Sequence, residues 1–203
     1  MFTGLIREMA KVQSFANNIL TLKAQYIPKI GDSIAINGAC LTVVHVGSGT
    51  FSVELSPESQ KLLAMENYKG IVHIEPAMMM GDRFEGHVVQ GHVDCVGTIL
   101  QIKKNGNSND FYIQVPKVFM KYMIPKGSVT IDGVSLTINE ILKDRFRLTI
   151  IPHTVENTLF RTYKVGSKVN VETDMFARYI YNMFQKKDDH LTWDKVDQIM
   201  ASY

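Results

Sequence analysis

The chain contains one nine-residue phrase in two copies, and this repetition limits the folds that the chain can adopt. Residues 36–44 read Ile-Asn-Gly-Ala-Cys-Leu-Thr-Val-Val, and residues 131–139 read Ile-Asp-Gly-Val-Ser-Leu-Thr-Ile-Asn. Each copy opens with Asn-Gly or Asp-Gly between stretches rich in β-branched residues, and these pairs tolerate the positive φ angles of a tight hairpin turn. The sequence therefore predicts two equivalent β-hairpins.

The repetition extends well beyond the phrase. An offset of 95 residues relates Gly38 to Gly133, Cys40 to Ser135, Phe51 to Phe146 and Pro57 to Pro152. Further on, residues 169–172 resemble residues 72–75 at an offset of 97, which is the small drift that loop insertions produce. A period of this length is too long for a solenoid and indicates duplication of a whole domain.

Within each copy the predicted strands are short and separated by turn signals. They cover residues 21–25, 33–36, 41–46 and 51–55 in the first copy, and residues 111–115, 128–131, 136–142 and 146–151 in the second. This spacing predicts a small antiparallel barrel, closed or nearly closed. Short helices are expected after Pro57 and Pro152, over residues 58–65 and 154–160, because proline is favoured in a first helical turn. Residues 78–90 read as the linker between the two copies.

The carboxyl-terminal part has a different pattern, with helical spacing. Residues 175–186 form one predicted helix, and a second apolar stripe follows, made of Trp193, Val196, Met200 and Tyr203. Helices this short are marginal alone, so each apolar face needs a partner. For the second stripe that partner is either its own barrel or another subunit.

Composition narrows the class of partner. A formal net charge of +2 with 21% charged residues, and no basic stripe interleaved with aromatic residues, argues against nucleic acid and favours a small molecule. Two cysteines make no disulfide framework, which indicates a reducing compartment. The amino terminus lacks a targeting pattern and no apolar run is long enough for a membrane span, so cytoplasm or an organelle stroma is expected.

The repeated phrase carries the candidate chemistry. Cys40 and Thr42 share one face of a strand, and Ser135 and Thr137 share the equivalent face, because residues two apart point the same way. A lone cysteine is more often a small core residue than a nucleophile. Its recurrence as serine in an otherwise kept phrase favours chemistry at both positions.

A run of residues 86–94 contains two histidines, His87 and His92. Their spacing of five puts them on different faces of a strand or a helix, so they are poorly placed to chelate one ion. Neither His-Glu-x-x-His, nor Cys-x-x-Cys, nor a glycine-rich phosphate loop is present, so no metal site is expected. His92 beside Asp94 has the parts of an oriented acid or base, although such a histidine is commonly structural.

The motifs together resemble the α-chain type of riboflavin synthase, a lumazine-binding double-barrel family. They are Met-Phe-Thr-Gly-Leu-Ile, Asn-Gly-Ala-Cys-Leu-Thr-Val, Gly-His-Val-Val-Gln-Gly-His-Val-Asp, Asp-Gly-Val-Ser-Leu-Thr, Ile-Pro-His-Thr and Val-Asn-Val-Glu-Thr-Asp, in this order from residue 1 to about residue 186. The resemblance implies a mainly β fold of two homologous six-stranded Greek-key barrels, residues 1–87 and 88–174, and a helical tail, residues 175–203, that makes a homotrimer. It also implies a transferase that converts two molecules of 6,7-dimethyl-8-ribityllumazine into riboflavin and 5-amino-6-ribitylaminouracil, without a cofactor or a metal.

By the same resemblance the catalytic set comprises Cys40, His92, Ser135, Thr137 and Asp174. Ligand contacts assigned to the first barrel are Gly4, Leu5, Ile6, Ser33, Cys40, Leu41, Thr42, Glu54, Leu55, Ser56, Pro57, Glu58 and Ser59. Those assigned to the second are Gly91, His92, Val93, Lys126, Ser135, Leu136, Thr137, Ile150, Ile151, Pro152, His153, Thr154 and Val155. Residues 60–67 depart from the family pattern, which leaves the helix contacts of the first barrel open.

The resemblance also predicts where the two substrates meet. The working site is expected between chains, with Cys40 of one chain paired with His92 and Ser135 of another. A non-catalytic lumazine or flavin carrier on the same fold is the alternative, although such carriers tend to lose residues that this chain keeps, namely Cys40, His92 or Thr137. Association with a lumazine synthase is left open.

Overall fold

Six antiparallel strands close into a barrel in the first half of the chain. The computed structural model describes residues 1–185 and 200. The strands are β1 (Glu8–Ala16), β2 (Ile19–Lys23), β3 (Ser33–Ile36), β4 (Ala39–Gly47), β5 (Thr50–Glu54) and β6 (Ile71–Pro76), in the spatial order β1-β2-β5-β4-β3-β6. The helix α1 (Pro57–Leu62) and the 3₁₀ helix η1 (Met65–Asn67) connect β5 to β6.

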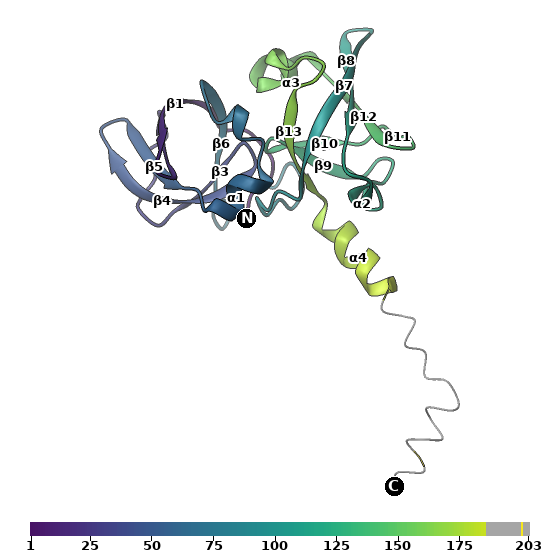
Figure 1. The fold of residues 1–203 in the computed structure, drawn as a ribbon, viewed down its shortest axis with the longest axis horizontal. Coiled ribbons are helices and arrows are strands. Elements are labelled where there is room, and N and C mark those ends of the chain that lie inside the picture. Colours follow the sequence, from purple (N-terminus) through teal and green to yellow (C-terminus); the bar gives the residue numbers. More distant parts are fainter. Residues whose placement is uncertain (186–199, 201–203) are drawn as a thin grey trace.

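The second half repeats this arrangement beside the first (Figure 1). Its elements are β7 (Cys95–Asn105), β8 (Ser108–Gln114), α2 (Lys117–Met120), β9 (Ser128–Ile131), β10 (Val134–Thr137), β11 (Glu140–Ile141), β12 (Arg145–Ile150), α3 (Pro152–Asn157), η2 (Leu159–Thr162) and β13 (Lys168–Thr173). The order is β10-β9-β13-β7-β8-β12-β11, so β10 and β11 are the two edges. They are consecutive along the chain and together stand where β4 stands in the first barrel, so the strand order of both halves is the same.

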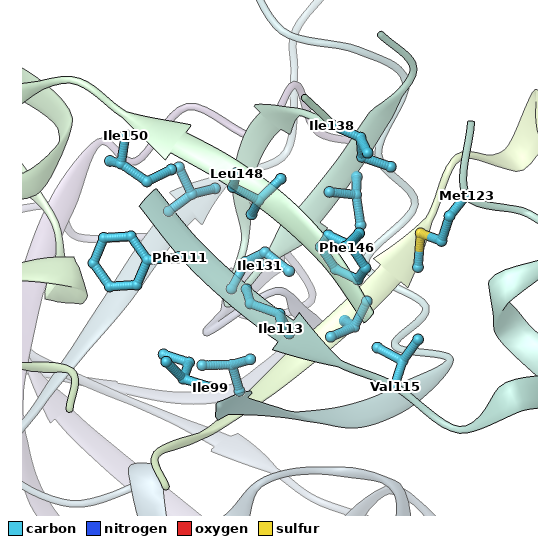
Figure 2. Close-up of a cluster of buried hydrophobic side chains, with 14 of the residues drawn as sticks. Ile99, Phe111, Ile113, Val115, Met123, Ile131, Ile138, Phe146, Leu148 and Ile150 are labelled. Carbon is cyan, nitrogen blue, oxygen red and sulfur yellow. The ribbon is translucent and has the colours of Figure 1, made fainter. Parts of the chain in front are cut away.

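Alternating side chains fill each barrel. Along β12, Phe146, Leu148 and Ile150 are buried while the residues between them are half-buried. Figure 2 shows these three converging with Ile99, Phe111, Ile113, Val115, Met123, Ile131 and Ile138 from the surrounding strands and connections. Burial of one such side chain stabilises the fold by about 1.5–3 kcal/mol, so each half has its own apolar core.

The two predicted hairpin turns meet at the junction of the barrels. Asn37 and Gly38 have φ angles of 45° and 81°, and Asp132 and Gly133 have 44° and 85°, which confirms the turn prediction. A Cβ atom on Gly38 would lie 2.7 Å from the amide nitrogen of Gly133, so the glycines are needed for the close approach as well as for the turn. The turns are buried, whereas a hairpin turn on a single barrel would face solvent.

A second pairing crosses the junction. Phe2 and Val89 form an isolated antiparallel bridge, with Phe2 N donating to Val89 O (2.8 Å) and Val89 N to Phe2 O (3.1 Å). Residues 2–7, which lead into β1, and residues 89–94, which lead into β7, are called here the N-terminal arm and the linker arm. The two arms are therefore held together between the barrels.

The predicted helix at residues 175–186 is α4 (Met175–Gln185), which extends away from the second barrel (Figure 1). The second apolar stripe lies outside the described residues except for Met200, which is exposed. The predicted helices at residues 58–65 and 154–160 are each split into an α-turn and a 3₁₀ turn. Among the described helices none is long and apolar enough to cross a membrane.

Candidate active site

Cys40 and Ser135 occupy the same position in the two barrels. Each is the second residue of the strand that follows the buried turn. The amide of Cys40 donates to the carbonyl of Gly91 (2.9 Å), and the amide of Ser135 donates to the carbonyl of Gly4 (2.8 Å). Both glycines have positive φ, and a Cβ atom on either would lie 2.6 Å from the Cβ of the residue that it covers. Only glycine fits at these two crossings.

The arms are therefore exchanged between the barrels. The N-terminal arm belongs to the first barrel and covers Ser135 in the second, whereas the linker arm belongs to the second barrel and covers Cys40 in the first. The resemblance assigns the contacts of residues 4–6 to the first barrel and those of residues 91–93 to the second, whereas in the fold Gly4 lies against Ser135 and Gly91 against Cys40, each in the opposite barrel. The Phe2–Val89 bridge pairs the two arms at the junction, and each arm then continues to the hairpin of the opposite barrel. No local sequence pattern reveals this crossing.

A cavity of about 270 Å³ opens beside Ser135, and it is called here the Ser135 mouth. It is lined by Gly4, Leu5, Ile6, Arg7, Val134, Ser135, His153, Thr154, Asn157 and Thr158, which come from the N-terminal arm, β10, and α3 with its C-cap. The structure thus brings together six of the predicted ligand contacts. A larger cavity of about 830 Å³, lined by residues of β7, β8, β12 and the segments beside them, contains none of the predicted site residues.

The hydroxyl of Ser135 lies 2.7 Å from Nδ1 of His87, and the hydroxyl of Thr130 lies 3.3 Å from Nε2 of the same ring. Burial lowers the pKa of His87, and the nearby Asp174 carboxylate acts in the opposite direction. His87 was not among the predicted site residues, because only the folded linker brings it to Ser135. The signal was present in the first histidine of the run of residues 86–94.

The residues around Cys40 form the group that the repeat relates to the Ser135 mouth, and this group is called here the Cys40 mouth by that equivalence. Cys40 is half-buried, and Thr42 is paired with Ser33 on the same outward face. His92 is exposed and directly follows Gly91, whose carbonyl accepts from the amide of Cys40, so its backbone lies beside Cys40 of its own chain. Within one chain the linker arm therefore carries His92 to the Cys40 side of the junction, whereas the resemblance groups His92 with Ser135. Leu41 points into the core instead.

The other cysteine has a different environment. Cys95 is buried, and burial together with the nearby Asp94 charge raises the pKa of its thiol to about 12. Because thiolate is the reactive form, Cys95 is inert at neutral pH. Both cysteines are free, and Cys40 is the more accessible of the two.

Lys126 stands out by its backbone. Its φ of 66° is in the left-handed region, and its amide donates to the carbonyl of Ile138 (2.7 Å), one residue past Thr137. Gly31 holds the equivalent position in the first barrel, with φ of 90° and an amide bond to Val43 O (2.9 Å). A positive φ is uncommon for lysine, so this backbone conformation distinguishes Lys126 from its counterpart Gly31.

The remaining predicted residues begin the short helices. Ser56 caps α1, since its hydroxyl accepts from the amide of Ser59 (3.0 Å), with Glu54, Leu55, Pro57 and Glu58 around it. Ile150, Ile151, Pro152 and Val155 lead into and form α3. Asp174 precedes α4 and accepts from the amide of Phe176 (2.8 Å). Within residues 1–185 and 200, His, Cys, Asp and Glu form no group of three or more that could hold a metal ion.

Known proteins match this arrangement along most of the chain. The lumazine binding domain family matches twice, at residues 3–77 and 90–174, once for each barrel. Riboflavin synthase of Photobacterium phosphoreum is 43% identical over 191 residues, covering 89% of this chain and 87% of that protein. Riboflavin synthase of Bacillus subtilis (strain 168) is 36% identical over 211 residues, covering 100% and 98%. The chain belongs to the riboflavin synthase family.

The double-barrel fold of the riboflavin synthase family is also found in solved structures of LumP. LumP complexed with riboflavin has a TM-score of 0.76 and 22% identity, and LumP complexed with 6,7-dimethyl-8-(1'-D-ribityl) lumazine has 0.73 and 21%. Each match covers 85% of this chain and 99% of LumP. The predicted membership of the riboflavin synthase family and the mainly β double-barrel fold are both confirmed.

Proposed function

We propose that the chain is a riboflavin synthase, a transferase that makes riboflavin and 5-amino-6-ribitylaminouracil from two molecules of 6,7-dimethyl-8-ribityllumazine. One lumazine donates a four-carbon unit and the other accepts it, so two substrates account for every atom of the two products. The observation that carries the proposal is the matched pair of mouths, each with Cys40 or Ser135 at the same strand position under an equivalent arm. Holding two substrates in register contributes up to roughly 7–11 kcal/mol.

The Ser135 mouth supplies a group that can take a proton. With the Ser135 hydroxyl donating to Nδ1 of His87, the proton on Nε2 faces the hydroxyl of Thr130. Because burial lowers the pKa of His87, its ring is neutral near pH 7 and can accept a proton. A serine bonded to such a base is an activated nucleophile. Asp174 then stabilises the charged ring.

The Cys40 mouth supplies the second set of reactive groups. The thiol of Cys40, the hydroxyl of Thr42 and the exposed ring of His92 are the groups that can exchange protons or add to a ring carbon there. The helix α1 is the counterpart of α3 in the repeat, so α1 is expected to line the Cys40 mouth as α3 lines the Ser135 mouth. The other ligand contacts named from the sequence, Lys126 and Thr137 included, remain part of the proposal.

The test is a direct assay. Incubation of the purified protein with the lumazine is expected to form one riboflavin for every two lumazines consumed, seen as growth of riboflavin absorbance. The second candidate function is a non-catalytic carrier, because LumP has this fold and is solved with riboflavin and with the lumazine. Binding of the lumazine without any riboflavin formation would establish the carrier and exclude the enzyme.

We further propose a homotrimer built through α4. No residue of this helix is buried in the described chain, and Tyr179 and Met183 are 59% and 70% exposed. An apolar helix face of this kind needs a partner. The proposed units are residues 1–87, 88–174 and the tail 175–203. Because Cys40 and Cys95 are both free thiols, we place the protein in a reducing compartment, the cytoplasm or an organelle stroma.

A further inference from the structure

Glu75 is a buried carboxylate in the last strand of the first barrel, and it is bonded to the N-terminal arm. Its Oε1 accepts from the amide of Thr3 (2.8 Å) and from the Thr3 hydroxyl (2.9 Å), and its Oε2 accepts from the amide of Gly4 (3.1 Å). Gly4 is the residue whose carbonyl receives the amide of Ser135. One side chain therefore fixes two consecutive peptide units directly at the Ser135 mouth.

Glu172 repeats this arrangement in the last strand of the second barrel. Its Oε1 accepts from the amide of Gln90 (2.8 Å) and its Oε2 from the amide of Gly91 (2.9 Å). Gly91 in turn receives the amide of Cys40. The equivalent of the Thr3 hydroxyl bond is absent among the described contacts of Glu172, and the Arg178 charge lies nearby instead.

A buried carboxylate costs free energy unless it is bonded, because burial disfavours its charged form. Burial raises the pKa of both glutamates, and the amide hydrogen bonds from the arms act against that rise. Every hydrogen bond described for either side chain goes to an arm. The two carboxylates therefore fix the positions of the arms, and neither makes a described side-chain hydrogen bond within its own barrel core.

We infer that Glu75 is the positioning residue for the Ser135 mouth and Glu172 the positioning residue for the Cys40 mouth. Each barrel thus controls, through one carboxylate, the arm that shapes the mouth of the other barrel. The assignment of each carboxylate to an arm depends on the hydrogen bonds alone. The effect of the arms on ligand binding rests on the proposed function, because it assumes that both mouths are lumazine sites.

Cys40 is a natural reporter for the linker arm, because Gly91 lies directly against it and Cys95 is buried. The rate of Cys40 modification by an aromatic disulfide reagent should rise about tenfold or more in Glu172→Gln. Glutamine keeps the shape of the side chain but replaces one acceptor oxygen with an NH2 donor, so one of the two arm amides loses its acceptor. Glu75→Gln is the matched control. In this variant the rate of Cys40 modification should stay within about twofold of the rate in the protein without substitutions.

The mirror experiment uses a chain with Cys40→Ser and Ser135→Cys, so that the reporter thiol lies under the N-terminal arm. Here Glu75→Gln should accelerate modification and Glu172→Gln should not. Melting temperatures of the two variants show whether either has lost global stability. If both glutamine variants accelerate modification of both reporter thiols, the substitutions loosen the whole protein. If neither variant accelerates modification, the carboxylates do not hold the arms. Either result overturns the inference.

A ligand arm separates this inference from the proposed function. Riboflavin at saturating concentration should protect Cys40 from the reagent, and the concentration needed should rise about tenfold in Glu172→Gln but not in Glu75→Gln. If riboflavin fails to protect the unmodified protein, the Cys40 mouth is not a flavin site, while the crossed pattern without ligand still decides the arm geometry. Protection that is unaffected by Glu172→Gln would overturn the ligand part of the inference.

Discussion

His73 and Asn170 make the same two hydrogen bonds across the barrel junction, in opposite directions. Nε2 of His73 accepts from the amide of Leu159 (2.7 Å), so its proton resides on Nδ1, which donates to the carbonyl of Asp132 (2.8 Å). Leu159 begins η2 and Asp132 lies in the hairpin turn of the second barrel. One imidazole of β6 thus bridges a turn and a helix of the neighbouring barrel.

Asn170 of β13 does the reverse with a carboxamide. Its Oδ1 accepts from the amide of Ala64 (2.8 Å), and its Nδ2 donates to the carbonyl of Asn37 (2.8 Å). Ala64 and Leu159, like Asn37 and Asp132, are separated by 95 residues, the repeat offset. A neutral imidazole offers one donor and one acceptor, and the Asn170 carboxamide supplies one of each to the equivalent two groups, which is why they replace one another here; its second N–H donates to the Tyr68 hydroxyl (3.2 Å).

Removal of the His73 ring should loosen the junction. His73→Ala leaves the Leu159 amide and the Asp132 carbonyl without partners in a buried place, and we expect a loss of about 2–4 kcal/mol in unfolding free energy, measured by urea denaturation. His73→Asn copies Asn170 and should recover at least half of that loss. If the alanine variant is as stable as the unmodified protein, the bridge does not contribute to the junction.

Asp132 predicts an unusual pH dependence. Burial raises its pKa to about 7, although the Tyr163 hydroxyl and the Asn170 amide act against this. Because the folded pKa exceeds the unfolded one, its contribution to stability is present below about pH 4 and is lost as the pH rises to about 7. The pH dependence of His73 has the opposite sign. Burial lowers its pKa to about 4, so its contribution to folding stability is lost as the pH falls from about 6.5 to 4.

The two contributions oppose each other between about pH 4 and 7, and a substitution separates them. Asp132→Asn, which copies Asn37, should be more stable than the unmodified protein at about pH 8 by on the order of 1–3 kcal/mol. Its stability should fall as the pH drops through the His73 range. Urea midpoints at several pH values test this, and a variant with an unchanged pH profile would show that Asp132 is ionised throughout.

Cys40 is expected to act in chemistry rather than in packing. Cys40→Ser should fold and bind the lumazine normally but lose about 10²-fold or more in turnover, the usual scale for a positioned catalytic group. Cys95→Ala is the matched control and should keep turnover within about twofold, because this thiol is buried and inert. Turnover of Cys40→Ser at the unmodified rate would make Cys40 structural.

Removal of α4 should abolish assembly. A chain that ends at Asp174 loses the exposed apolar face of the helix and is expected to sediment as a monomer with most activity gone. The barrels should stay folded with a small drop in melting temperature, because α4 has no buried residue in the described chain and contacts the second barrel mainly through Arg178, which pairs with Asp94 (2.9 Å) and Gln90 (2.8 Å), and through Tyr181 against Tyr122. A fully active trimer of the shortened chain would place the interface on the barrels instead.

The working site is expected to pair the Cys40 mouth of one chain with the Ser135 mouth of another. Inactive Cys40→Ala subunits mixed with inactive Ser135→Ala subunits under exchange conditions should regain up to about a third of the activity, because some interfaces then join two intact mouths. Mixed trimers confirmed by mass spectrometry but without recovered activity would place the site within one chain.

Much of the fold was predictable because it is coded locally. Asn-Gly and Asp-Gly place two residues at positive φ whatever surrounds them, so both hairpins followed from the sequence. The strands that open each barrel, β1 and β7, were not predicted. Both carry bulges, at residues 12–14 and 99–101, which break the alternation by which a strand is recognised. The strand β4 is bulged too, at residues 43–45, but it follows directly from the Asn-Gly turn that marks its start.

The candidate site divides in the same way. The sequence by itself determined the duplication, the paired positions of Cys40 and Ser135, and the outward face of each, since these depend on a repeat and on strand periodicity. Only the tertiary structure decided that the arms cross, that His87 meets Ser135, and that Gly38 packs on Gly133. Those contacts join segments from 48 to 131 residues apart, and their geometry is set by how two whole barrels pack, which no local pattern encodes.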